Sequence, residues 1–277
     1  MGTIMSEDRP EAHEDLPPLP LMAPCRQLDN RAPFRWLAEG YADMKHAPLQ
    51  SLLYGLIMAL ICMLLGATAM RYGGFLIPLA IMGGIVFIAP VLCLGLYAIS
   101  AQLERKQPAM LGRTFREAAK RRLSTELVFA LILLVVFLIW ARSFSMIQVF
   151  MPVDANPEFG EIASYVAVTL AVGGIFAAIT FACSAFALPM IMHRNVDAIT
   201  ATITSINAVL RNKKVMFIWS LIIVLTVIIG IATFFIGSIF LWPLIGLATW
   251  HAYLDTIDAR EFPRHEEGIT SIPRFLD

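Results

Sequence analysis

The sequence predicts an all-α, polytopic membrane protein with six transmembrane helices, cytoplasmic interfacial amphipathic helices and a three-fold internal repeat. Composition is the first reason. Hydrophobic residues make up 58% of the 277 residues and charged residues 15%, whereas soluble domains have about 45–50% and about 25%. The second reason is that the apolar residues form runs long enough to cross a bilayer. The third is that the basic residues gather between these runs, on one side.

Each predicted span holds about 20 apolar residues, enough to cross the roughly 30 Å hydrocarbon core. The last run, Val215 to Tyr253, has no formal charge over 39 residues. Because this is too long for one crossing, we divide it at a turn near Gly237 and Ser238. The predicted spans are about 50–70, 75–99, 124–141, 163–192, 215–235 and 238–254. They form a membrane domain over 31–258, between a Pro-rich tail at 1–30, predicted to be disordered, and a cytoplasmic tail at 259–277.

Basic residues set the predicted orientation. Of the 21 Lys and Arg residues, all but Arg71 and Arg142 lie on one side of a six-span arrangement. The positive-inside rule therefore places both termini in the cytoplasm.

The even-numbered spans align without a gap, so that Gly84, Gly174 and Gly237 coincide. An amphipathic segment precedes each odd-numbered span, at 33–46, 111–122 and 198–210. In the first segment the apolar face is Phe34, Leu37, Tyr41 and Met44. A helical unit used three times explains this pattern, and chance similarity between apolar spans is the alternative. We interpret Gly83, Gly84, Gly173 and Gly174 as helix-packing positions.

The predicted spans carry no ionisable residue in their middle. Ionisable groups within the membrane are typical of ion-coupled carriers, so their absence argues against a proton- or sodium-driven transporter. A passive pore, or a carrier for an apolar substrate, remains possible. The sequence has no Walker loop, GxSxG or HExxH motif, which favours a protein that is not an enzyme without deciding the question.

Polar residues are concentrated on the predicted cytoplasmic side. The candidate binding residues there are His193, Arg194, Asp197, Asn207, Arg211, Trp250, His251 and Tyr253. One interpretation is a belt that anchors the helices at the headgroups. The other is a shallow basic cup for anionic lipid headgroups or for the acidic face of a partner.

No metal site or cofactor is predicted. The weaker alternative is zinc held by His46, His193 and His251, which all fall at cytoplasmic ends of spans. We expect no haem, because haem ligands would have to lie in a prepared pocket and the histidines are interfacial.

Several stretches resemble a bacterial membrane family, domain of unknown function 2189. They include PFRWLAEGYADMKHAPLQSLLYGL at 33–56, APVLCLGLYAIS at 89–100, the R-x-V-D segment at 194–197 and TWHAY at 249–253. The resemblance covers roughly residues 33–258 and implies a multi-pass protein of the bacterial cytoplasmic (inner) membrane. Some relatives carry a cytochrome c oxidase label, which implies at most an accessory role beside a respiratory oxidase. The family supplies no catalytic residues.

These observations predict an accessory, scaffold or lipid-organising membrane protein with a cytoplasmic working face. The alternative is a passive channel or transporter for a small uncharged or amphipathic solute. Membrane lipids are the expected partners, with another membrane complex as a second possibility. The net charge is zero, so nucleic acid is not an expected partner.

Overall fold

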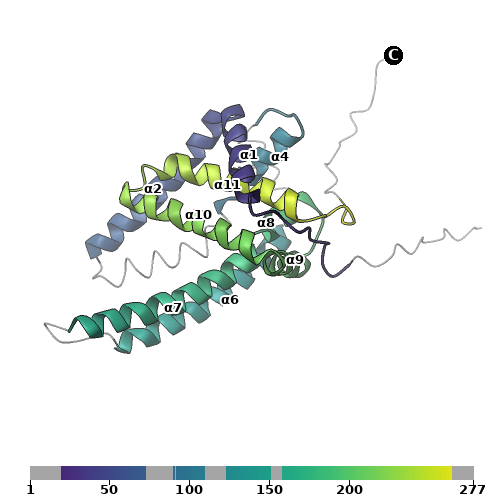
Figure 1. Cartoon of the computed structure of the whole chain (residues 1–277). Coiled ribbons are helices and arrows are strands. Elements are labelled where there is room, and N and C mark those ends of the chain that lie inside the picture. Colours follow the sequence, from purple (N-terminus) through teal and green to yellow (C-terminus); the bar gives the residue numbers. More distant parts are fainter. Residues whose placement is uncertain (1–19, 73–89, 91, 110–122, 151–157, 264–277) are drawn as a thin grey trace, which may run out of the picture.

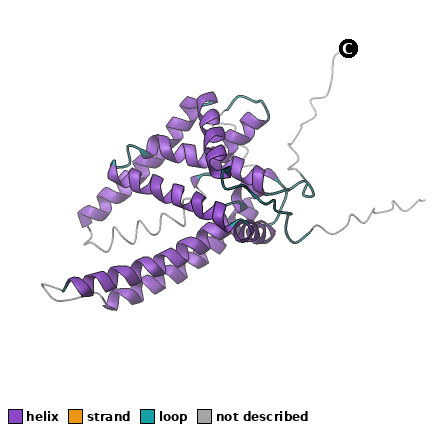
Figure 2. Cartoon of the chain, in the orientation of Figure 1, coloured by secondary structure: helices purple, strands orange, loops and turns teal. Residues whose placement is uncertain are grey.

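The computed structural model describes residues 20–72, 90, 92–109, 123–150 and 158–263. Within these ranges the chain is helical apart from loops and an isolated antiparallel bridge between Cys25 and Ile257 (Figure 2). The helices are α1 (Ala32–His46), α2 (Pro48–Tyr72), α4 (Leu94–Glu104), α6 (Leu123–Ile147), the 3-10 helix η1 (Gln148–Phe150), α7 (Phe159–Ser184), α8 (Ala187–His193), α9 (Ala198–Arg211), α10 (Lys213–Ala232) and α11 (Ser238–Thr256).

Four helical stretches are long and apolar enough to cross a membrane. They are Pro48–Thr68, Leu127–Phe150, Phe159–His193 and Lys213–Ala232, and they coincide with the predicted spans 50–70, 124–141, 163–192 and 215–235. Most of the predicted span 75–99 lies outside the described residues. The predicted span 238–254 is the helix α11, which is not among the four. A total of six spans therefore stays a prediction.

Figure 1 shows two opposite ends of the helices. The C-terminal ends of α2 and α6, the N-terminal end of α7 and the α10–α11 connection lie toward the left of the view, whereas α1, α4, α8 and α9 lie toward the opposite end. We call this opposite end, together with the last two turns of α11, the polar end. The long run from Val215 is divided as expected, because α10 ends at Ala232 and α11 begins at Ser238.

The predicted span 163–192 is interrupted between α7 and α8. Pro189 has no N–H to donate to the preceding turn, so a continuous helix is disfavoured there. The Ser205 hydroxyl of α9 accepts a hydrogen bond from Phe186 N at 3.1 Å and donates to Ala182 O at 2.8 Å. A hydroxyl can do both, so α9 satisfies backbone groups that the interruption frees.

The buried core lies at the polar end. Its largest fully buried side chains include Trp36, Phe186, Trp219, Trp250 and Tyr253. By contrast, α6 and α7 leave many large apolar side chains exposed along their length. Because monomeric soluble proteins rarely expose such a continuous apolar surface, these helices are suited to contact with lipid.

Two of the predicted amphipathic segments are the helices α1 and α9, and the segment 111–122 lies outside the described residues. Of the predicted apolar face of α1, Met44 is buried against the chain, whereas Phe34 is 61% and Tyr41 is 44% exposed. The buried face instead centres on Trp36 and Gly40. Packing against α11 decides which face is covered, and periodicity alone does not reveal it.

Close helix contacts use glycines other than the expected ones. A Cβ on Gly55 of α2 would lie 2.1 Å from Ile239 O of α11, whereas one on Gly173 or Gly174 would meet nothing within 4 Å. The two glycines of α7 therefore pack against no described part of the chain. Gly174 lies inside α7 and Gly237 just before α11, while Gly83 and Gly84 are outside the described residues, so the repeat stays a prediction.

The end of the tail that is predicted to be disordered makes defined contacts with the helices. Residues 20–30, called here the N-terminal segment, run along α9 and α11. Ala23 N donates to Thr204 Oγ1 at 3.1 Å, Arg26 N donates to Thr256 O at 2.8 Å, and Asp258 N donates to Pro24 O at 2.9 Å. These contacts satisfy backbone groups of an extended segment that cannot satisfy them itself.

Candidate functional site

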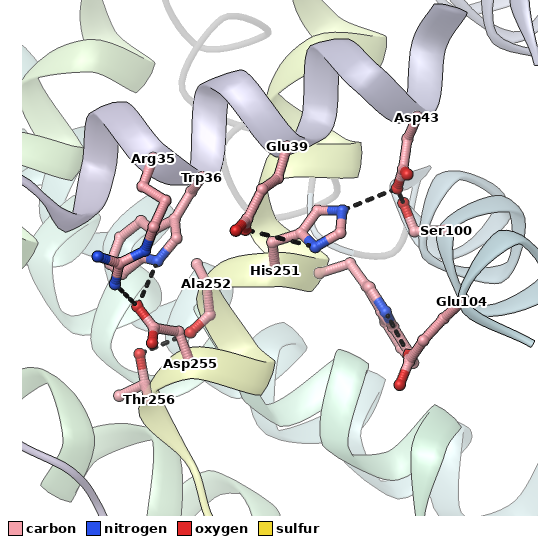
Figure 3. A network of polar contacts seen from close by, with 11 residues as sticks. Arg35, Trp36, Glu39, Asp43, Ser100, Glu104, His251, Ala252, Asp255 and Thr256 are labelled. Carbon is pink, nitrogen blue, oxygen red and sulfur yellow. Dashed lines mark hydrogen bonds and ion pairs between the residues drawn. The ribbon is translucent and has the colours of Figure 1, made fainter. Parts of the chain in front are cut away.

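The polar end is organised where α1 crosses α11. A Cβ on Gly40 would lie 2.7 Å from Ala248 N, so only glycine lets the two helices approach this closely. Glu39 and Asp43 are four residues apart and therefore lie on one face of α1. The crossing directs both carboxylates toward His251 of α11 (Figure 3).

His251 lies between the two carboxylates. Its Nε2 is 2.8 Å from Asp43 Oδ2, and its Nδ1 is 3.5 Å from Glu39 Oε2. Ser100 of α4 donates to the same Asp43 oxygen at 2.6 Å. Three helices, α1, α4 and α11, thus meet at one carboxylate.

The charges around His251 favour its protonated form. His251 lies beyond the four membrane-length helices, level with the charged groups of α1. Burial lowers its pKa, but the hydrogen bond and charge of Asp43, with the charges of Glu39 and Glu104, outweigh burial and raise it above the ordinary value. The structure is therefore most consistent with an imidazolium that joins α1 to α11.

A second contact joins the same two helices one turn further along. Asp255 of α11 accepts from the Arg35 guanidinium at 2.5 Å and from Trp36 Nε1 at 2.9 Å. The Trp36 ring packs edge-to-face on Trp219 of α10, with ring centroids 5.5 Å apart. The Asp255 contacts hold α1 on α11 at one end of the crossing, and the His251 contacts hold it at the other end.

The His251 contact predicts that stability depends on pH. The pKa of His251 is raised in the folded protein. Its contribution to the free energy of unfolding is therefore fully present below the pKa of the unfolded chain, about 6.5. That contribution is lost as the pH rises through the pKa of the folded protein. Replacing His251 by glutamine should cost about 1.5–3 kcal/mol at low pH, the range for hydrogen bonds to charged groups, and much less at high pH. Thermal unfolding of both proteins in detergent from about pH 6 to about pH 9 measures this.

Comparison with the variant isolates the pH dependence that comes from residue 251, because all other residues are the same in both proteins. If the difference in stability between wild type and His251→Gln is the same at every pH, His251 does not join the helices as a cation.

Four of the predicted site residues meet in a separate cluster. The His193 ring at the end of α8 packs on Trp250 and Tyr253, and its Nδ1 lies 2.9 Å from the Tyr253 hydroxyl. Trp250 Nε1 donates to Glu104 Oε2 at 3.2 Å. Arg194 is buried and donates to Phe262 O at 3.0 Å. Arg194 therefore stabilises the fold of residues 262–263 from within, so it does not line an open cup.

The other predicted residues lie apart from this cluster. Asp197 caps α9 by accepting from Ile199 N and Thr200 N, each at 2.9 Å. Burial alone would raise the pKa of Asp197, but hydrogen bonds from the Thr200 hydroxyl and from the backbone of Thr200 and Ile199 lower it below the ordinary value. Asn207 donates to Cys25 Sγ at 3.5 Å. Arg211 is exposed in the last turn of α9. The eight residues thus form no common site.

The geometry does not support nucleophilic catalysis at His251. Ser100 donates to Asp43 and not to the imidazole, and both ring nitrogens face carboxylates. A general base would need one nitrogen open to the nucleophile.

The zinc alternative is not supported either. Among the described residues, no three His, Cys, Asp or Glu side chains are grouped so that they could hold a metal ion. His46 instead lies with Nδ1 2.7 Å from Ala42 O of its own helix.

Sequence reasoning did not single out Glu39 and Glu104. Glu39, Glu104 and Asp255 receive the polar contacts of α11 and α1. The available signal was the spacing of Glu39 and Asp43 on one helical face in an otherwise basic region. Trp36 was missed because its neighbours Phe34 and Leu37 fit an apolar stripe equally well.

Comparison with known proteins gives one match. Residues 76–193 match the family model described as "predicted integral membrane protein", domain of unknown function 2189. No curated protein and no solved structure matches the chain. The matched range includes two of the four membrane-length helices. The match agrees with the apolar helices in identifying an integral membrane protein.

Proposed function

We propose that this integral membrane protein is an accessory protein, a scaffold or lipid-organising subunit, and that its polar end is the working face. The observation that carries the proposal is the fixed position of α1. Its inner face is held on α11 by Trp36, Glu39 and Asp43. Its outer face is left exposed, with Phe34 and Tyr41 among basic residues.

An ordered helix that presents aromatic and basic side chains has the composition of an interface. Arg31 and Lys45 lie exposed near the two ends of α1, and Lys45 Nζ lies 4.4 Å from the centroid of the Tyr41 ring. Such a surface suits a partner with an acidic face, because complementary charges steer association.

In the proposed arrangement the polar end faces the cytoplasm of a bacterium, the chain crosses the inner membrane six times and both termini are cytoplasmic. The excess of Lys and Arg at this end supports the orientation. The C-terminal end of α11 lies at the cytoplasmic headgroup level in this arrangement, where His251 and Asp255 bind charged groups of α1.

Charge reversal on α1 tests the proposal. Tagged wild type purified in mild detergent should retain a protein partner at fixed stoichiometry, and the Arg31→Glu/Lys45→Glu variant should lose it because the acidic partner is repelled. Native mass spectrometry measures the stoichiometry. The amount of membrane-inserted protein should not change, because both side chains are exposed.

The matched control is Arg71→Glu/Arg142→Glu, which reverses two exposed charges predicted to lie on the other side. A single cysteine at His46, in a chain without the four native cysteines, should react with a membrane-impermeant label only after cells are opened. Labelling in intact cells contradicts the orientation. If the wild-type protein purifies without a protein partner and a small uncharged solute stabilises it, the result favours the channel alternative.

A further inference from the structure

A basic cavity of about 330 Å³ lies at the corner where α9 ends and α10 begins. This volume falls at the lower end of the range of about 300–1,000 Å³ for small-ligand sites. Its lining includes Arg211, Lys213 and Lys214 on one side and Gln27 and Asn30 of the N-terminal segment on the other. The cavity is separate from the His251 contacts and from the His193 cluster.

Among the described residues, the three cations have no carboxylate partner. Arg211, Lys213 and Lys214 are exposed, and within the described part of the chain none of them forms an ion pair. Asp29 is the acidic residue nearest along the N-terminal segment, and its charge acts on Arg35 of α1. The cavity therefore carries an uncompensated positive charge.

Asn212 fixes the walls of the cavity. Its side chain accepts from Leu28 N at 3.0 Å and donates to Arg26 O at 3.0 Å and to Ala208 O at 3.1 Å. Asn212 is only 6% exposed. Because one amide holds both the N-terminal segment and the end of α9, the backbone of the two walls is held in place before any ligand binds.

An exposed apolar stripe begins directly below the cations. Phe217, Leu221, Val224 and Ile228 of α10 are each at least half exposed. They follow Lys213 at helical intervals of four, eight, eleven and fifteen residues, so they lie on the same face of α10. Such a stripe on a membrane-length helix fits an acyl chain, and the cations at its end fit a phosphate group.

We propose that this corner is a binding site for one anionic phospholipid. The phosphodiester and headgroup bind among Arg211, Lys213 and Lys214, and an acyl chain lies along the stripe that starts at Phe217. Charge complementarity and the continuity of cavity and stripe distinguish a lipid from a free anion. The assignment rests on the proposed function, since it requires the polar end to lie at a membrane surface.

Lipid binding to a charge-removed variant tests the site. Detergent-purified full-length wild type should bind dioleoylphosphatidylglycerol in native mass spectra and be stabilised by it. Arg211→Gln/Lys213→Gln/Lys214→Gln should bind it on the order of 100-fold more weakly, because each basic residue near a membrane surface contributes about fivefold. Dioleoylphosphatidylcholine, which has the same chains and no net charge, should bind both proteins equally and weakly.

The matched control, Arg105→Gln/Lys106→Gln/Arg260→Gln, removes three exposed cations elsewhere at the polar end and should bind the lipid as wild type does. Inorganic phosphate should not displace the lipid; complete displacement at millimolar concentration would assign a free-anion site instead. Equal affinity of wild type and the charge-removed variant for phosphatidylglycerol overturns the proposal. Unfolding temperatures without lipid show whether the charge-removed variant is folded.

A single substitution keeps the proposal testable if the triple variant misfolds. Lys214→Gln alone should weaken phosphatidylglycerol binding by about fivefold. The protein partner is measured in the same preparations. If the charge-removed variant loses the lipid but keeps the protein partner, the lipid site is supported independently of the proposed function. If the partner is lost only in Arg31→Glu/Lys45→Glu, that result supports the proposed function and does not bear on the lipid site.

Discussion

Replacing Trp36 by alanine should destabilise the protein by about 3–5 kcal/mol, the usual cost of truncating a buried tryptophan. The side chain is 0% exposed. It packs edge-to-face on Trp219 and donates from Nε1 to Asp255, so the variant leaves a cavity and removes a hydrogen bond that joins α1 to α11. Thermal or denaturant unfolding in detergent measures the loss.

Phe34→Ala is the matched control, two residues away on the same helix. Phe34 is 61% exposed, so its loss should change stability by less than about 0.5 kcal/mol. A larger effect at Phe34 than at Trp36 would mean that the stripe predicted from the sequence is the buried face of α1, and that the packing on α11 is wrong.

Replacing Gly55 by alanine should also be strongly destabilising, although alanine is the better helix former by about 1 kcal/mol. The new Cβ would lie 2.1 Å from Ile239 O and 2.7 Å from Pro243 Cγ. A backbone atom cannot rotate away, so α2 and α11 must separate. Overpacking of this kind costs about 1–3 kcal/mol and occasionally more.

Gly173→Ala tests the same substitution where no atom of the described residues would lie within 4 Å of the new Cβ. Helix propensity then acts alone, and the variant should be neutral or slightly more stable. The two variants should therefore shift the unfolding temperature in opposite directions. A destabilised Gly173→Ala with a neutral Gly55→Ala would place the close helix contact in α7 and contradict the α2–α11 packing.

Local information in the sequence was enough to predict the helices. Apolar runs of 20 residues indicate membrane-length helices because a bilayer accommodates little else, and the run from Val215 is too long for one of them. The interruption between α7 and α8 was harder to predict. Pro189 hinted at it, but the hydroxyl of Ser205 that stabilises it comes from α9, which is distant in the sequence.

The candidate site was predicted less well, because it depends on which helix faces meet. Sequence reasoning placed His251 and Arg194 in one polar layer, and both do lie at the polar end. It could not show that Arg194 turns inward to Phe262 O while His251 turns toward Asp43. The direction of a side chain follows from the crossing of α1 and α11 at Gly40, and no local pattern encodes that crossing.

The attachment of the N-terminal segment has a consequence for the order of biosynthesis. Arg26 and Asp258 are 232 residues apart in the chain, so the contact between them cannot form until almost the whole protein has left the ribosome. At roughly 5–20 residues per second, the first segment waits roughly 12–46 s for its binding surface. During this interval Ala23 and Cys25, both buried in the finished protein, remain accessible to chaperones, proteases and oxidants. Completion of the C-terminal helices ends this exposure.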